Sequence, residues 1–322
     1  MRRKVSHAAP RTTASRPPLG RLHDVSGRSL MLHRSGTGGP AVVFLPGAGM
    51  VGLDYLNIHD RTAETTTSVL YDRAGTGWST PVPLPRGAAD VTAELHSLLG
   101  EAGVPGPYVL VGHSLGGAYA RHFAQHYPKD VAGLLLLDPF HEDLHGLGPQ
   151  EAREQLARLH AAPVPELTPE QLDQARAQAA PLFAAWPATV AEALAEHHAT
   201  TAWRTGLYED RNLYDEVAQE LRAAPALPDV PMIVVTARGH DDTQSHLWQD
   251  DVLRQIDTLK AALHTRLASS VPRGEHRTLH DAGHAWLHEE RQDAVLGAID
   301  DLLGLVRRDQ GEPLVPPHST TH

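Results

Sequence analysis

Short apolar runs recur along the chain and alternate with longer segments in which apolar residues return at helical spacing. Each run is four or five residues long, as expected of a strand that is buried on both faces of a sheet. Alternation of such strands with helices predicts an α/β fold with a mostly parallel sheet. The runs are AVVFL (41–45), SVLY (68–71), YVLVG (108–112), GLLLL (133–137) and MIVVT (232–236).

The two ends of the chain have a different character. Near the start, the segments RLHDVSG and SLMLHRSG predict an antiparallel hairpin that extends the sheet. Residues 1–20 and 308–322 are rich in Arg, Ser, Thr and Pro or otherwise polar, so we expect a flexible arm and a flexible tail that carry no chemistry.

Between residues 140 and 228 the strand-like runs disappear. This stretch is rich in Ala, Glu, Gln and Leu and is broken repeatedly by proline, which predicts short helices. Because strand signals resume at Val230, we interpret it as a helical cap inserted into one α/β core, with core parts at 21–139 and 229–307. A separate helical domain is the alternative.

Composition narrows the classes of function. The formal net charge of -11 argues against nucleic acid or an anionic membrane as the main partner, and the absence of cysteine excludes disulfides and thiol chemistry. The basic N-terminus lacks the apolar region of a secretory signal, and no run approaches the ~18 apolar residues of a membrane span. We therefore expect a soluble, cytoplasmic protein that acts on a small molecule and needs no cofactor.

Two sequence motifs are candidates for a catalytic site, and HEDLH is the first. It matches the H-E-x-x-H pattern in which His141 and His145 would bind zinc from one helix, with Glu151 as an imaginable third ligand. Pro139 precedes the string and GLGP follows it, so a helix there lasts little more than one turn. A zinc peptidase is therefore the least favoured alternative.

The second string, GHSLG at 112–116, matches G-x-S-x-G. A buried strand precedes Ser114 directly and a helical pattern follows it, which is the sharp strand-to-helix turn that this motif requires. At the carboxyl end of the sheet the hydroxyl of Ser114 would be exposed to a ligand, so we predict that Ser114 is a nucleophile. The alternative is that Ser114 only caps the helix.

A serine nucleophile needs a base and an acid. His284, in DAGHAWLH, follows the last predicted strand at the same edge of the sheet as Ser114, and His288 is the alternative base. For the acid we rank Asp241 first, Asp138 second and Asp242 third, because each follows a predicted strand. Asp241 and Asp242 lie in ARGHDD, and Asp138 directly follows GLLLL.

Two backbone amides should stabilise the oxyanion. One is the N–H of Leu115, and the other comes from the loop LPGAGM, where we choose Ala48 because Gly47 lets the backbone approach closely. We expect Gly47, His113 and Trp78 to line the substrate pocket, although Trp78 could instead pack inside the protein.

Four motifs together resemble the α/β-hydrolase fold superfamily: VVFLPGAG, YDRAGTGWS, LVGHSLGG and DAGHAWLH. The resemblance implies an eight-stranded sheet with helices on both faces, a cap after the sixth strand, and the order Ser, acid, His. It favours Asp241, which follows the penultimate strand. Some lipases of the superfamily place the acid one strand earlier, and Asp138 in LLLLDP matches them.

The sequence departs from the usual pattern at Pro46, where members often have His, while Ala48 is still possible as a donor. Serine in place of aspartate at the motif argues against dehalogenase and epoxide hydrolase chemistry, which uses an aspartate nucleophile. We therefore predict hydrolysis of an ester or related acyl compound through an acyl-enzyme. The alternatives are acyl transfer, lactone cleavage or carbon-carbon cleavage on the same residues, and a non-catalytic binding protein.

Overall fold

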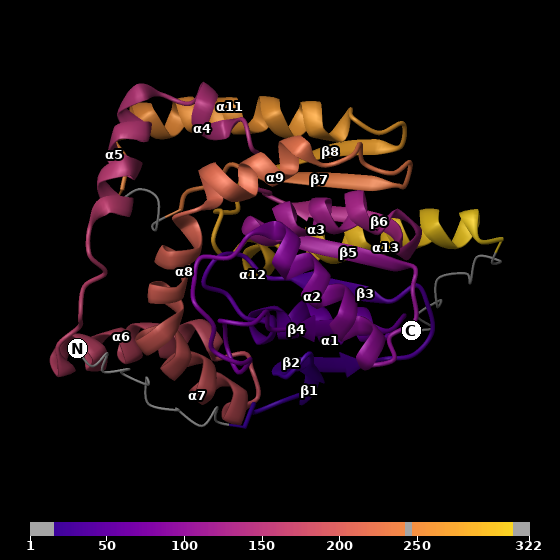
Figure 1. Ribbon diagram of the computed structural model, residues 1–322, viewed down its shortest axis with the longest axis horizontal. Coiled ribbons are helices and arrows are strands. Elements are labelled where there is room, and N and C mark those ends of the chain that lie inside the picture. The colour runs from indigo at the N-terminus through magenta and orange to yellow at the C-terminus, as the bar shows by residue number, and fades with distance from the viewer. Residues whose placement is uncertain (1–15, 242–246, 312–322) are drawn as a thin grey trace, which may run out of the picture.

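The architecture was obtained as a computed structural model that describes residues 16–241 and 247–311 (Figure 1). Most of the predicted arm and tail therefore lies outside the described residues. The predicted runs form buried strands, and the early hairpin forms as well. The strands are β1 (Arg21–Val25), β2 (Arg28–Ser35), β3 (Val42–Leu45), β4 (Ser68–Tyr71), β5 (Tyr108–His113), β6 (Val131–Leu137), β7 (Met232–Ala237) and β8 (Gly274–Leu279).

All eight strands belong to one sheet, in the order β1-β2-β4-β3-β5-β6-β7-β8. The pairs β1–β2 and β2–β4 are antiparallel, and every other neighbouring pair is parallel. The prediction of a mostly parallel, eight-stranded sheet is confirmed. Its parallel part brings the carboxyl ends of β3, β5, β6, β7 and β8 to one edge, where ligands bind in open α/β sheets.

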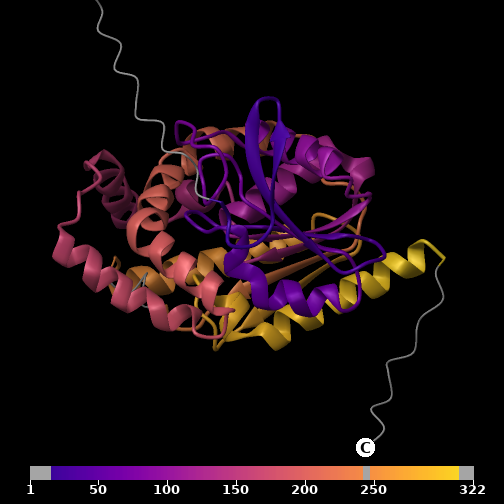
Figure 2. The same ribbon diagram turned by 90° about the horizontal axis from the view of Figure 1, so that it is seen from below.

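Successive side chains of the parallel strands enter two different apolar layers, as the two-residue period of a strand requires. In β6, for example, Leu134 and Leu136 belong to one buried cluster and Leu135 and Leu137 to the other. Helices α2 (Ala88–Glu101), α3 (Leu115–His126) and α11 (Asp250–Ala268) cover the first layer, and α1 (Leu56–Ala63) and α13 (Gln292–Asp309) cover the second. Figure 2 shows α13, in yellow, on the side opposite to α2.

The chain between β6 and β7 is helical, and we call residues 140–228 the cap segment. Its helices gather at one end of the sheet, at the left of Figure 1. They pack on the core through buried contacts such as the hydrogen bond from the Trp186 indole N–H to the Leu53 carbonyl, at 2.9 Å. The helices are α4 (Leu144–Leu147), α5 (Gln150–Ala161), α6 (Pro169–Ala179), α7 (Ala188–His197), α8 (Trp203–Asp210) and α9 (Ala218–Ala223).

Within the described parts of the chain, no helix combines the length and the apolar composition that crossing a lipid bilayer requires.

Candidate active site

Ser114 lies in a strained turn between β5 and α3. Its φ of 52° and ψ of -117° are unusual for a residue with a side chain, and such strain persists only where the surroundings enforce it. A Cβ on Gly112 would lie 2.5 Å from the Gly116 carbonyl oxygen, and a Cβ on Gly116 would lie 1.9 Å from that of Leu45. Both glycines of the motif are therefore needed for the turn to close against β3.

Three polar side chains form a chain of contacts at the carboxyl edge of the sheet. The Oγ of Ser114 lies 3.0 Å from Nε2 of His284, and Nδ1 of His284 lies 2.6 Å from Oδ2 of Asp138. Because the carboxylate can only accept, the Nδ1–H of His284 donates to it, and Nε2 is left to accept from the Ser114 hydroxyl. This arrangement suits transfer of a proton from Ser114 to His284.

Asp138 is fully buried and held by several donors. Its Oδ1 accepts from the Ala237 amide at 3.0 Å, and its Oδ2 accepts from the Lys260 ammonium at 3.0 Å as well as from His284. Burial raises the pKa of Asp138, but Lys260 and His284 outweigh burial and hold this pKa well below its usual range. Asp138 is therefore a carboxylate throughout the physiological pH range.

Lys260, on α11, is also buried and remains charged. Its ammonium lies 3.0 Å from Asp138 and 3.3 Å from Asp257. Burial lowers the pKa of Lys260, yet the two carboxylates outweigh burial and raise it above its usual value. The group beneath His284 is thus an ion pair and not an isolated buried carboxylate.

The other two candidate acids have different places. Asp241 accepts a hydrogen bond from the Ala285 amide at 2.9 Å, and so it holds the backbone next to His284. Asp242 lies outside the described residues. The geometry therefore puts Asp138 before Asp241 as the partner of the imidazole, which reverses the order that the sequence suggested. The turn at Asp138 has a φ of 41° and brings its Oδ2 to 2.6 Å from His284 Nδ1, whereas Asp241 binds the backbone of Ala285 instead.

The candidate oxyanion donors lie beside Ser114. A Cβ on Gly47 would be 3.5 Å from the Ser114 Cβ, which shows how closely the loop after β3 approaches. The amides of Ala48 and Leu115 make no hydrogen bond to any residue of 16–241 or 247–311. The Gly47 amide, in contrast, already donates to the Tyr55 hydroxyl at 3.3 Å. The hydrogen bonds of the described residues therefore leave both predicted amides without a protein acceptor.

Both ring nitrogens of His113 are bound to neighbouring groups. The Nε2–H of His113 donates to the His284 carbonyl at 2.8 Å, and its Nδ1 accepts from the Tyr55 hydroxyl at 2.7 Å. Burial lowers the pKa of His113 well below its usual value, so the ring is neutral. Trp78 is buried and packs on His197 of the cap segment, with ring centroids 5.7 Å apart.

The HEDLH string is not on one helix. His141 precedes α4, which begins at Leu144, and the Nδ1 of His141 accepts from the Asp143 amide at 3.2 Å. Glu142 forms a paired contact with the Arg121 guanidinium at 2.7 and 2.8 Å. The string therefore lacks the helical spacing that would turn His141 and His145 toward one ion.

Four residues near the site were missed by reasoning from the sequence: Tyr55, Arg73, Glu209 and Lys260. One of them, Lys260, carried a usable signal. It falls on the largely apolar face of α11, in register with the buried positions 263, 264, 267 and 268, and a charge on such a face indicates a buried partner. Glu209 carried no such signal, because the other buried residue of α8 is the polar Thr205.

The sheet is open and mostly parallel, and Ser114, His284 and Asp138 are in contact at its carboxyl edge. These features are typical of α/β-hydrolase folds. The profile of the alpha/beta hydrolase family matches residues 42–298, and the chain belongs to this family.

Several proteins are similar to this chain. The lipase LipV of Mycobacterium tuberculosis is 32% identical over 178 residues, which cover 52% of this chain and 62% of LipV. The uncharacterized protein YbdG of Bacillus subtilis is 28% identical over 121 residues, 37% of each chain. These matches span less than two thirds of either relative. A thermophilic esterase from Thermogutta terrifontis shares the fold, with a TM-score of 0.59, 19% identity and coverage of 88% of this chain and 97% of its own.

Proposed function

We propose that the protein is a serine-dependent hydrolase of an ester or a related acyl compound. The observation that carries this proposal is the series of contacts from Ser114 Oγ to His284 Nε2 at 3.0 Å and from His284 Nδ1 to Asp138 at 2.6 Å. The names of relatives such as LipV and the esterase from Thermogutta terrifontis add support, since both act on esters by name.

In the proposed reaction, Ser114 attacks the acyl carbon while its proton moves to His284 Nε2. The negative charge that develops on the carbonyl oxygen is stabilised by the amides of Leu115 and Ala48. The His284 imidazolium then gives the proton to the leaving alcohol, and an acyl-enzyme forms on Ser114. Water then gives a proton to His284 as it attacks the acyl-enzyme, and His284 returns this proton to Ser114 Oγ as the acid is released.

Asp138 has two roles in this proposal. It accepts from Nδ1 of His284, which keeps the imidazole in the tautomer with a free Nε2, and its charge stabilises the imidazolium. Lys260 shares the same carboxylate oxygen and keeps the buried charge paired. No cofactor is needed for any of these steps.

A panel of aryl esters of different acyl lengths tests the proposal. We expect the wild-type protein to hydrolyse at least one ester, Ser114→Ala to lose this activity, and a fluorophosphonate to label Ser114 once. His141→Ala and added chelator should change little. Activity that survives Ser114→Ala but disappears with chelator would contradict the proposal and favour a metal-dependent reaction.

A further inference from the structure

Two charged side chains, Arg73 and Glu209, bind three successive peptide units of the loop after β3. Arg73 Nη1 donates to the Pro46 carbonyl at 3.0 Å, and Arg73 Nη2 donates to the Gly47 carbonyl at 2.8 Å. Glu209 Oε2 accepts from the Gly49 amide at 2.8 Å. Each contact lies within normal hydrogen-bond geometry, so the orientation of each peptide plane in this loop is fixed.

The contacts of the Gly47 carbonyl, from Arg73 at 2.8 Å and from the Met50 amide at 3.2 Å, determine where the Ala48 amide points. In a trans peptide, the C=O and N–H of one unit point in opposite directions. The Gly47 carbonyl and the Ala48 N–H belong to the same unit, so a carbonyl bound to Arg73 turns the Ala48 N–H away from Arg73. Because Gly47 lies against Ser114, this N–H is turned toward the space where the oxyanion is proposed to form.

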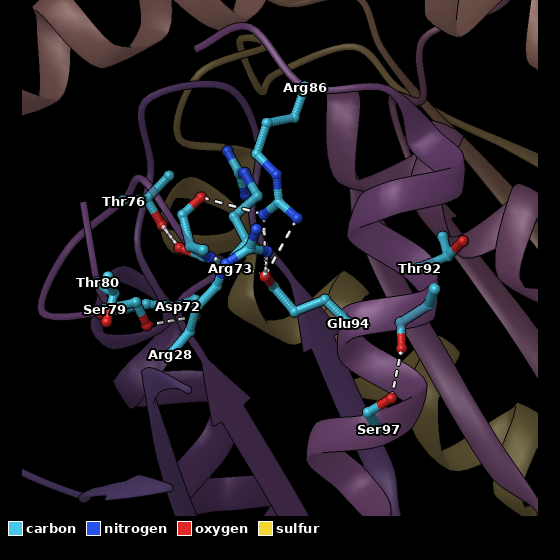
Figure 3. A network of polar contacts seen from close by, with 12 residues as sticks. Arg28, Asp72, Arg73, Thr76, Ser79, Thr80, Arg86, Thr92, Glu94 and Ser97 are labelled. Carbon is cyan, nitrogen blue, oxygen red and sulfur yellow. Dashed lines mark hydrogen bonds and ion pairs between the residues drawn. The ribbon is translucent and has the colours of Figure 1, made fainter. Parts of the chain in front are cut away.

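Arg73 and Glu209 hold each other in place. Arg73 Nε lies 2.5 Å from Glu209 Oε1 and Nη2 lies 2.6 Å from Oε2, while the two side chains are only 1% and 3% exposed. Arg73 follows β4 and sits beside Asp72 in the loop that Figure 3 shows, whereas Glu209 comes from α8 of the cap segment. A planar guanidinium has five N–H donors in a fixed fork, so Arg73 can bind two carbonyls and both oxygens of a carboxylate at once, whereas an ammonium has only three donors.

We infer that Glu209 of the cap segment is a positioning residue that, through Arg73, orients the Ala48 amide as an oxyanion donor. This inference rests on the proposed function. It makes the docked cap a condition for a complete oxyanion site, since Glu209 also binds Gly49 directly. The cap backbone leaves little room for other loop conformations, because a Cβ on Gly49 would lie 2.5 Å from the Ala202 carbonyl.

Three substitutions test this inference: Arg73→Met, Arg73→Lys and Glu209→Gln. We expect kcat for an aryl ester to fall about 100-fold in Arg73→Met and about tenfold or more in the other two, with KM nearly unchanged. Affinity for a trifluoromethyl ketone, which forms an oxyanion on Ser114, should fall in proportion to kcat/KM. Hydrogen exchange of residues 47–49 should become faster in all three.

Glu94→Gln is the matched control, because Glu94 and Arg86 form another buried Arg–Glu pair, also drawn in Figure 3, that does not contact residues 46–49. It should lower the melting temperature but leave kcat and the exchange of residues 47–49 unchanged. If the wild-type protein cleaves esters and Glu209→Gln alters neither kcat nor exchange, the inference is wrong and the proposed function stands. If hydrogen exchange of residues 47–49 becomes faster in the variants but the wild-type protein cleaves no ester, the proposed function fails. The role of Arg73 and Glu209 in holding the loop then stands.

A second and independent observation concerns a buried histidine of α1, His59, whose ring lies beside that of His33 on β2. His59 is fully buried, and its Nδ1 lies 2.7 Å from the Ser68 hydroxyl. Its Nε2 has no hydrogen-bond partner among the described residues, and the nearest carboxylate oxygen, Oδ1 of Asp60, is 3.9 Å away. A buried ring nitrogen without a hydrogen-bond partner is uncommon, and a bound ion or water is one explanation for it.

Two further side chains lie near His59, and one of them, His33, also contacts the Ser35 hydroxyl through Nε2 at 3.2 Å. The His33 ring lies beside His59, with centroids 4.9 Å apart, and one ligand atom from each of His33, His59 and Asp60 lies within 4.8 Å of the others. Two imidazoles and a carboxylate are ligands that zinc and similar ions prefer, with water completing a tetrahedron. Ser68 could accept the Nδ1–H of His59, as an outer partner of a metal-bound histidine does.

We propose that His33, His59 and Asp60 bind a divalent transition metal, with zinc as the best match. The exposed Asp60 gives the ion a path from solvent, and a modest movement of the side chains would bring the ligand atoms to bonding distance. The site is formed by β2 and α1 and uses no residue of the proposed reaction, so its role would be structural.

Titration of the metal-free protein with Co²⁺, followed through the visible absorption of a tetrahedral site, tests this proposal. We expect one strongly absorbing Co²⁺ per chain, displaced by Zn²⁺, and a loss of affinity of about tenfold or more in His33→Gln and in Asp60→Asn. Zinc should also raise the melting temperature of the wild-type protein and not that of these variants. Both variants change solvent-accessible side chains, so misfolding is not expected to obscure the result.

The matched control is His96→Gln, which removes the histidine of a half-exposed His–Asp pair with Asp130 elsewhere on the surface. It should leave Co²⁺ absorption and zinc stabilisation unchanged. Binding that is equally strong in His33→Gln and Asp60→Asn, or absorption typical of octahedral surface sites only, would overturn the proposal.

Discussion

The two sides of the candidate site are held by different parts of the chain. On the side of His284, Asp138 follows β6 and Lys260 lies on α11, and both belong to the core. On the side of the loop after β3, the core residue Arg73 is paired with Glu209 of the cap segment. The comparison teaches that the proposed base is in place once the core has folded, whereas the proposed oxyanion donor also requires the cap.

The largest expected effect separates the two candidate acids on the core side. Asp138→Asn should lower kcat for an aryl ester about 10⁴-fold, because the amide favours the wrong tautomer of His284 and brings no charge to the imidazolium. Asp241→Asn should lower kcat by less than about tenfold, since an Asn oxygen can still accept from the Ala285 amide. Steady-state kinetics of both variants make the comparison, and losses of equal size would contradict the assignment of Asp138.

A second prediction concerns the ion pair beneath His284. Lys260→Met leaves the Asp138 charge buried without its cation, so the free energy of unfolding should fall by about 3–5 kcal/mol. Urea denaturation followed by circular dichroism measures this loss, and the exposed Lys129→Met serves as control. A loss in Lys260→Met no larger than in the control would mean that the core side is not held by this pair.

The third prediction tests how the cap is attached. His198 of the cap segment donates from Nε2 to Asp54 Oδ1 at 2.9 Å. Burial lowers the pKa of His198, but Asp54 outweighs burial and raises it above its usual value. A raised pKa in the folded state means that protonated His198 stabilises the fold below its unfolded pKa, and that this contribution disappears as the pH rises through the folded value.

His198→Gln should therefore lower the free energy of unfolding by about 1.5–3 kcal/mol near pH 6 and by less near about pH 9. Urea denaturation at the two pH values gives the difference. A loss of the same size at both would show that the charge of His198 does not contribute to attachment of the cap.

The smallest expected effect lies where the two sides meet. Tyr55 accepts from the Gly47 amide and donates to His113, which in turn donates to the His284 carbonyl. Tyr55→Phe removes this hydroxyl but keeps the ring stacked on His288, with centroids 4.2 Å apart. We expect kcat to fall about tenfold or less, which corresponds to one or two hydrogen bonds.

Tyr71→Phe is the control for this variant, because Tyr71 is equally buried and its hydroxyl has no hydrogen-bond partner among the described residues. Its kcat should equal that of the wild-type protein. If the two variants behave alike, Tyr55 does not connect the two sides of the site.

Much of the fold could be predicted because it depends on local patterns. The runs that became β3, β5, β6 and β7 are apolar on both faces. The glycines around Ser114 are required because a Cβ on Gly116, for example, would lie 1.9 Å from the Leu45 carbonyl oxygen. Chain order alone also placed His284 at the edge where it meets Ser114. These features follow from strand period, burial and topology, which a sequence records directly.

The acid could not be decided in this way. Asp138 and Asp241 both follow strands that end at the same edge, and their distances to His284 depend on how far each strand extends and on the turn after it. Arg73 and Glu209 are 136 positions apart, and their pairing depends on the packing of the cap. A sequence shows that such charges exist, but only the packed structure shows which of them meet.

The hydrogen bond between Asp241 and the Ala285 amide also bears on how the position of the acid could change during evolution. Asp241 lies in the loop after β7, one strand away from Asp138, and it already touches the segment that carries His284. A lineage could therefore move its acid from one strand to the next through an ancestor that has both carboxylates, without passing through one that has neither. Such an arrangement lets the acid change its position along the chain while the order Ser, acid, His stays the same.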